Sequence, residues 1–138
     1  MEQLAVEIVG LCREYGECRV EVERMEEVRR VKNALESVWV VARRKLDISD
    51  PALLLALLDA YEVTRDEGML QEVLDVVGRN LDRLAVSAES VKLLAYCYYY
   101  VEEEECAERA RRMLEELRKM GRGEEELADA ETILEELT

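Results

Sequence analysis

Five carboxylates in the last third of the chain have a spacing that could hold a metal ion. If the two segments that carry them form adjacent helices, their oxygens could gather around a divalent cation, because Mg²⁺ and Ca²⁺ prefer hard oxygen ligands. The chain has 33 acidic residues, so such spacings also arise by chance, and the alternative is a pair of solvated acidic faces. The five residues are Glu104, Glu105, Glu108, Glu126 and Asp129.

This spacing, Glu104-Glu105-x-x-Glu108 followed by Glu126-x-x-Asp129, resembles the EExxE and ExxD carboxylates of MazG-type nucleoside-triphosphate pyrophosphohydrolases. In that family the carboxylates hold magnesium on facing helices. The resemblance implies an all-α, magnesium-dependent hydrolase of nucleoside triphosphates, with the same five carboxylates as metal ligands.

The chain contains no histidine, so it lacks the side chain that most often acts as a general base. This excludes Ser-His and Cys-His nucleophile pairs and the Glu-x-x-His signature of di-iron helical bundles. The stretch closest to a glycine-rich phosphate loop, Gly121-Arg122-Gly123, has neither the preceding strand nor the lysine that such a loop needs. Apart from the carboxylates, we therefore expect no catalytic residue, no metal and no cofactor.

The four cysteines form two candidate disulfide pairs. None belongs to a Cys-x-x-Cys motif, and no histidine is present to complete a zinc shell. The members of each pair lie equally far on either side of a predicted turn, so they should face each other across a helical hairpin. Free buried thiols are the alternative, since intracellular disulfides are common only in some hyperthermophiles. The pairs are Cys12 with Cys18 and Cys97 with Cys106.

Tyrosines and basic clusters are candidates for a contact surface. The tyrosines near residue 100 cannot all point inward from one helix, so at least one ring should be exposed or lie in an interface. The basic clusters at residues 29–32 and 43–45 either pair with nearby glutamates and a helix C-terminus, or bind an acidic partner or a second copy of the chain. The candidate contact residues are Tyr61, Tyr96, Tyr98, Tyr99, Tyr100, Arg43, Arg44 and Lys45.

The elements that position these side chains are predicted to be helices. Hydrophobic residues make up 49% of the chain, and they are mainly leucine, valine, alanine and methionine, with no phenylalanine. One proline and six glycines leave little turn density between the apolar segments. This composition indicates a folded, all-α protein.

Apolar residues at helical spacing predict about seven helices, stacked as antiparallel hairpins. Gly16 is expected to interrupt the first, while Asp50 and Ser87 are expected to cap the third and the fifth. Residues 53–58 are apolar all round, so the third helix should be central. No flexible linker divides the chain, which predicts a single domain over residues 1–138. The apolar stripes span about residues 4–15, 25–46, 51–64, 70–84, 88–101, 106–117 and 127–137.

An internal repeat relates two of the predicted hairpins. Moving residues 54–77 by 37 positions superposes buried-type residues on one another, Tyr61 on Tyr98 among them. The pattern resembles the tetratricopeptide repeat, which implies helix hairpins that bind a protein or peptide on a concave face. An irregular up-and-down bundle is the alternative. The residues that fit the characteristic positions of the repeat are Val91, Leu94, Ala95, Tyr98 and Ala107.

Charge and composition restrict the partners and the habitat. A net charge of -14 repels phosphate backbones and anionic lipids, so neither nucleic acid nor a membrane is expected as partner. The first residues have no basic region, and no apolar stretch approaches the roughly 20 residues of a membrane span, which predicts a cytoplasmic protein. Arginine outnumbers lysine and amide side chains are few, which is typical of thermophiles or of a GC-rich genome.

The leading functional hypothesis is a non-enzymatic protein-protein interaction module or scaffold with an acidic, tyrosine-bearing surface. It would bind a basic protein or peptide, or associate with itself. The alternatives are the magnesium-dependent hydrolase and a structural subunit of a larger assembly.

Overall fold

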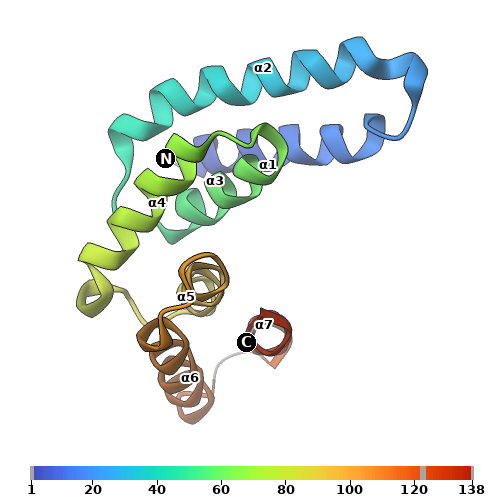
Figure 1. Cartoon of the computed structure of the whole chain (residues 1–138). Helices are drawn as coiled ribbons and strands as arrows, with labels where there is room; N and C mark the ends of the chain where they lie inside the picture. Colours follow the sequence, from blue (N-terminus) through green and yellow to red (C-terminus); the bar gives the residue numbers. More distant parts are fainter. Residues whose placement is uncertain (1, 122–123, 138) are drawn as a thin grey trace. The chain divides into compact units, whose positions relative to one another are not determined.

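The computed structural model describes residues 2–121 and 124–137, and seven α-helices contain most of them (Figure 1). None of these described residues belongs to a β-strand, so the all-α fold class is confirmed. None of the described helices is long and apolar enough to cross a membrane. The α-helices are α1 (Glu2–Cys18), α2 (Met25–Ala42), α3 (Pro51–Thr64), α4 (Glu67–Arg79), α5 (Ala88–Val101), α6 (Glu104–Lys119) and α7 (Glu124–Leu137). Short 3₁₀ helices are η1 (Val22–Arg24), η2 (Arg43–Lys45) and η3 (Leu81–Arg83).

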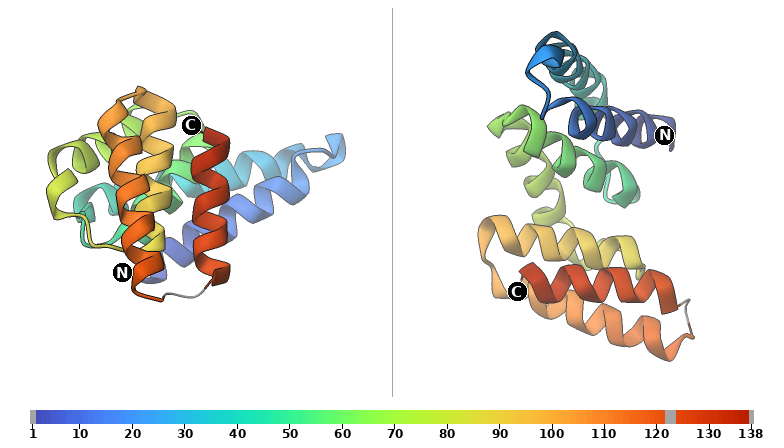
Figure 2. Two further views of the ribbon diagram at one scale, coloured as in Figure 1. Left: turned by 90° about the horizontal axis from the view of Figure 1, so that it is seen from below. Right: turned by 90° about the vertical axis from the view of Figure 1, so that its right-hand side faces the viewer.

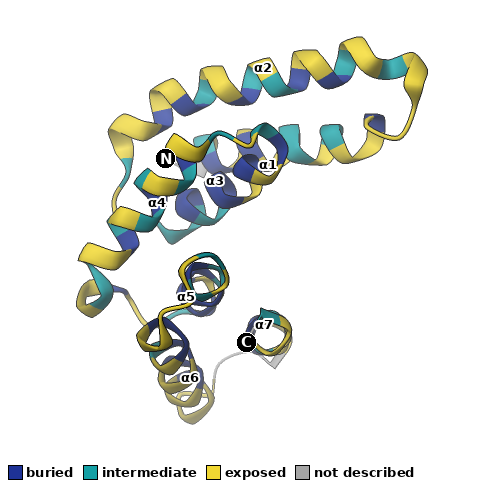
Figure 3. Cartoon of the chain, in the orientation of Figure 1, coloured by how far each residue is buried: buried dark blue, intermediate teal, exposed yellow. Residues whose placement is uncertain are grey.

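Backbone contacts group the chain into two compact units, residues 1–76 and 77–138, and the division passes through α4. Each unit has its own buried apolar residues (Figure 3). The single domain predicted from the sequence stays a prediction.

In the first unit, α1 packs against both α2 and α3 (Figures 1 and 2). Every third or fourth residue of α2 faces this core, so the opposite face of α2 is left to solvent. The buried residues of α2 are Val28, Val31, Leu35, Trp39 and Ala42.

The predicted interruption of the first helix at Gly16 is wrong, because α1 continues to Cys18. Gly16 lies on the exposed face of α1, and an added Cβ atom there would meet nothing within 4 Å. An exposed glycine in a helix costs only about 1 kcal/mol relative to alanine. The buried side chains of Ile8 and Cys18, on either side of it, hold the helix against its neighbours and offset that cost.

α3 begins as predicted, with the side chain of Asp50 accepting a hydrogen bond from the Leu53 amide at 3.3 Å and Pro51 as the first helical residue. It is buried almost all round, which confirms its central position. Its buried residues are Leu53, Leu54, Ala56, Leu57, Leu58, Ala60, Tyr61 and Val63.

In the second unit α5 packs against α6 and α7, and the three axes run side by side (Figure 2). Ser87 caps α5 as predicted by accepting from the Ser90 amide at 3.1 Å. The narrow stripe of α7 consists of Leu127, Ala130 and Leu134, all buried. At the predicted stop after α6, Gly121 has a φ of 68°, while Arg122 and Gly123 lie outside the described residues.

The internal repeat appears as two equivalent helices. α3 and α5 have 14 residues each, and their caps, Asp50 and Ser87, are separated by the predicted offset. Both helices end on a left-handed residue, Arg65 with φ 57° and Glu102 with φ 54°. The helices that follow differ, because α6 packs closely along α5 whereas α4 does not approach α3 in this way. Membership of the tetratricopeptide family stays a prediction.

Candidate functional site

The five carboxylates of the predicted metal site do not come together. Arg118, near the end of α6, forms an ion pair with Glu131 of α7, so the two helices run antiparallel. Glu126 and Asp129, near the start of α7, therefore lie beside the end of α6. Glu108, like Glu104 and Glu105, belongs to the opposite end of α6, about 15 Å away at ~1.5 Å per residue.

The described residues contain no group of three or more acidic, cysteine or histidine side chains that could hold a metal ion. The sequence placed these carboxylates on neighbouring helices but did not reveal the direction of the second helix. Because α6 and α7 form a hairpin, their first turns lie at opposite ends of the pair. The metal-binding arrangement inferred from the spacing is therefore wrong for this chain on its own.

All four cysteines are free thiols. Cys12 and Cys18 share α1 and lie about 9 Å apart along its axis, beyond the roughly 7 Å Cα separation that a disulfide spans. That predicted pairing is wrong because no turn separates the two residues. Cys97 on α5 and Cys106 on α6 do flank the predicted turn, and both are buried.

Burial makes the thiols of Cys12, Cys97 and Cys106 poor nucleophiles. It raises the pKa of Cys12 to about 11, with a smaller contribution from the nearby Asp59 carboxylate. Burial also raises the pKa of Cys97 and of Cys106. Since the thiolate is the reactive form, these groups remain protonated and unreactive at neutral pH.

The candidate tyrosines occupy different environments. Tyr61 is buried, and Tyr96, Tyr98 and Tyr100 are half-buried. Tyr99 is 54% exposed and packs edge-on against Tyr100, with ring centroids 5.1 Å apart. This agrees with the expectation that at least one ring lies outside the core.

Tyr61 and Tyr98 are equivalent residues in the two turns that follow α3 and α5. The Tyr61 hydroxyl donates to Oε1 of Glu67 at 3.0 Å, and the Tyr98 hydroxyl donates to Oε1 of Glu104 at 3.3 Å. In both turns the left-handed residue donates its amide to the tyrosine carbonyl at 2.7 Å. Each tyrosine thus ties the end of one helix to the start of the next.

Side chains in the turn after α3 form an ion pair, a ring contact and capping hydrogen bonds. Arg65 pairs with Glu62 at 3.3 Å and lies over the Tyr61 ring at 5.8 Å. Asp66 caps α4 by accepting from the Gly68 amide at 3.0 Å and from the Met69 amide at 3.3 Å. Residues of this segment therefore supply the interactions that stabilise the turn.

The turn after α5 lacks these interactions. Glu102 is the left-handed residue, and Glu103, at the N-cap of α6, makes no side-chain capping bond. Neither carboxylate forms an ion pair within the part of the chain that the structure describes. Where the first turn has the polar Glu62 and Thr64, this one has Tyr99 and Val101, the latter 44% exposed.

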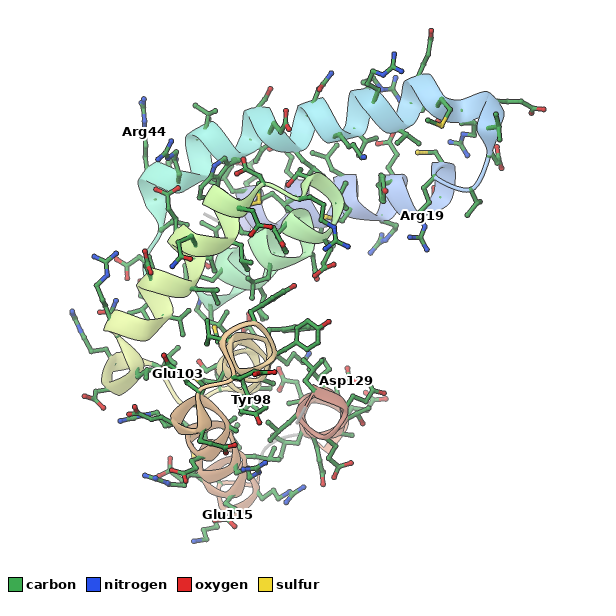
Figure 4. The ribbon with its side chains drawn as sticks, in the orientation of Figure 1. Arg19, Arg44, Tyr98, Glu103, Glu115 and Asp129 are labelled. Carbon is green, nitrogen blue, oxygen red and sulfur yellow. The ribbon has the colours of Figure 1, made fainter. Side chains whose placement is uncertain are left out.

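We call the exposed residues around this turn the acidic turn: Tyr99, Val101 and Glu102–Glu105. Figure 4 labels Tyr98, near the end of α5, and Glu103, in the segment that joins α5 to α6. Glu105 is partly neutralised by Arg109 at 3.4 Å. The sequence drew attention to the tyrosines and, separately, to Glu104 and Glu105, and the exposed Val101 was missed.

A second exposed surface lies at the end of α2. Arg43 is occupied, because it pairs with Glu72 at 3.0 Å and lies over the Trp39 ring at 5.8 Å. Arg44 projects away from the ribbon (Figure 4), and among the described residues neither Arg44 nor Lys45 has an ion-pair partner.

Two apolar side chains accompany these cations. Val40 is 55% exposed and Val41 is 48% exposed, one helical turn before Arg44 and Lys45 respectively. All four side chains are exposed and lie within six consecutive residues, where α2 passes into η2, so they are close together on the surface. We call Val40, Val41, Arg44 and Lys45 the basic end. The sequence analysis indicated its cations but did not single out its valines, which lie between the stripe residues Trp39 and Ala42.

No protein-family model, no curated protein and no solved structure matches this chain.

Proposed function

We propose that this protein is a non-enzymatic protein-interaction module and that the acidic turn is its docking surface. The observation that carries the proposal is the contrast between the two equivalent turns. The turn after α3 is capped, paired and polar, whereas the turn after α5 has the same backbone with exposed apolar side chains and unpaired carboxylates. Local features that reduce stability without compensation are expected at functional sites.

The stability that this turn gives up can be bounded. Both turns bear the roughly 1–2 kcal/mol of a non-glycine residue in the left-handed region, and the second turn alone lacks a side-chain N-cap, which costs about 1 kcal/mol more. Glu104 and Glu105 recover a part through the positive end of the α6 dipole. Glu102 and the two exposed apolar residues lie outside that turn of helix, so dipole stabilisation does not account for them.

The chemistry of the surface favours a basic protein segment with apolar side chains. Tyrosine is enriched in protein interfaces because its rigid ring buries a large area and its hydroxyl keeps a polar contact. Unpaired carboxylates around such a ring favour lysine or arginine on the partner and speed up its association.

The test transplants the first turn into the second. The variant Tyr99→Glu/Val101→Thr/Glu102→Arg/Glu103→Asp installs the residues found at the equivalent positions, so its fold and stability should be retained. The tagged chain and the variant are used to co-purify proteins from the cells that make the chain, with quantification by mass spectrometry. We expect at least one protein, further copies of the chain included, to fall at least about ten-fold, or ~1.4 kcal/mol, with the variant.

The matched control is Val6→Ser/Glu7→Lys, which removes one exposed apolar side chain and reverses one exposed charge on α1. It should retain the captured protein. Equal capture by the wild type, the control and the transplanted variant would show that the acidic turn is not the docking surface.

A further inference from the structure

The partner of the acidic turn can be inferred from the rest of the chain, and this step rests on the proposed function. We infer that the acidic turn of one copy docks on the basic end of a second copy, so that the protein assembles head to tail. The two surfaces match in composition. Each combines two exposed apolar side chains with two unpaired charges of one sign, and the signs are opposite.

The basic end is unusual for α2. The outward face of the helix is polar or charged along most of its length, with Arg29, Arg30, Asn33, Glu36 and Ser37 exposed. Beyond the exposed Met25 at its start, exposed large apolar side chains return only in its last turn, at Val40 and Val41. An apolar pair next to unpaired cations is costly to leave in water and is the composition expected of an interface.

The positive charge of the basic end indicates the kind of partner that binds there. In a chain of net charge -14, the basic end is a positive surface without carboxylate partners, so its partner must be acidic. The acidic turn needs a basic partner, and a second copy of the chain offers one in its basic end. The net charges of two copies repel at long range, but at physiological ionic strength the Debye length is about 8 Å, so contacting groups dominate.

The resulting interface is heterologous, because each copy contributes a different surface. Two copies joined by one such contact leave one acidic turn and one basic end, which dock each other or further copies, so assembly gives closed rings or chains. The expected average mass therefore rises with protein concentration above that of the monomer.

The experiment uses sedimentation velocity on the purified full chain over roughly 1 µM to 1 mM. The wild type should show an average mass that rises with concentration and falls at high salt. Arg44→Glu/Lys45→Glu and Glu102→Lys/Glu103→Lys each place like charges in contact, so each variant alone should remain monomeric.

An equimolar mixture of the two variants decides the geometry. The reversed basic end of the first then meets the reversed acidic turn of the second, and association should return to within about ten-fold of the wild-type constant. The control Glu7→Lys/Glu17→Lys makes the same change in net charge as Glu102→Lys/Glu103→Lys at exposed positions of α1, and it should associate like the wild type.

A wild type that stays monomeric at all concentrations would overturn the inference, as would a mixture that fails to associate. The proposed function is judged separately, by the co-purification described above. If the wild type is monomeric while the transplanted variant still loses a captured protein, the acidic turn docks another basic partner and the self-docking inference alone fails.

Discussion

α3 and α5 are closely similar helices, but the turns that follow them differ in their side-chain interactions. Both helices begin at a side-chain cap, have 14 residues, and end on a left-handed residue whose amide reaches the tyrosine carbonyl at 2.7 Å. Burial agrees position by position over residues 53–58 and 90–95, with Leu57 and Leu94 fully buried at equivalent positions. The packed part of the repeat has thus been kept while the exposed turn changed.

The difference lies in side chains that packing does not restrict. In the first turn Arg65 pairs with Glu62, and Asp66 accepts hydrogen bonds from two amides of α4. In the second turn Glu102 forms no ion pair and Glu103 forms no capping hydrogen bond among the described residues. The connection between α5 and α6 therefore has fewer stabilising side-chain interactions than the one between α3 and α4, although both follow the same helix ending.

The largest expected effect tests whether the two helices are equivalent. Leu57→Ala and Leu94→Ala should each lower the free energy of unfolding by about 2–5 kcal/mol, because each leaves a cavity at a fully buried site. Guanidinium unfolding followed by circular dichroism measures both. Leu55→Ala, at a half-buried position of α3, is the control and should cost less. Unequal losses, with one variant below about 1 kcal/mol, would break the equivalence.

The next effect concerns the caps that distinguish the turns. Asp66→Ala removes two hydrogen bonds to the first turn of α4 and should cost about 1 kcal/mol, whereas Glu103→Ala should change stability by less than ~0.5 kcal/mol. Glu103→Asp should raise stability, because Asp is a favoured N-cap and the backbone there is already extended. Thermal and denaturant unfolding report all three. A loss on Glu103→Ala as large as that on Asp66→Ala would contradict the contrast.

A smaller effect is expected at the left-handed residues. Glu102→Gly should stabilise the protein by about 1 kcal/mol, because glycine adopts positive φ without steric cost. Arg65→Gly should gain less, since it also loses the ion pair to Glu62 and the contact with the Tyr61 ring. The same unfolding measurements compare them. Equal gains would mean that the side chain of Arg65 contributes nothing to its turn.

The smallest effect is a pH dependence that the two turns share. The hydrogen bond to Glu67 raises the pKa of Tyr61, and the charge of Glu104 raises the pKa of Tyr98, with its hydrogen bond adding to this. A raised folded-state pKa means that the protonated phenol is favoured by folding. This contribution is complete below the ordinary tyrosine pKa of about 10 and is lost as pH rises through the raised value.

The melting temperature should therefore fall above about pH 10, and Tyr61→Phe/Tyr98→Phe should reduce that dependence. Melting curves by circular dichroism between roughly pH 8 and 12 provide the measurement. A decline of the same size in the double variant would assign it to other groups.

Much of the fold was readable because its signals are local. Asp50 and Ser87 were identified as caps from residue type and position, and both cap as expected. The apolar stripes predicted most of the buried residues, and the repeat offset predicted the equivalence of α3 and α5. Gly16 misled the prediction because a weak local preference was overridden by packing on both sides of it.

The candidate site was harder to predict from the sequence than the fold. The sequence offered the tyrosines and the basic cluster as candidates, but residue type cannot separate Tyr99 from the less exposed Tyr98 or Arg44 from the paired Arg43. The exposed Val101 was missed because an apolar residue in a helical stripe is normally assigned to the core, and Val40 and Val41, which lie outside the predicted stripe, were not singled out.

The sequence by itself determined that the chain is helical, where most helices begin, and which residue types are available for chemistry. These follow from propensity, capping and periodicity, which act over a few neighbouring residues. Only the tertiary structure decided that α7 runs antiparallel to α6, which separates the five carboxylates, and which charges and apolar groups lack partners. Those outcomes depend on contacts between residues far apart in the chain, and no local pattern contains them.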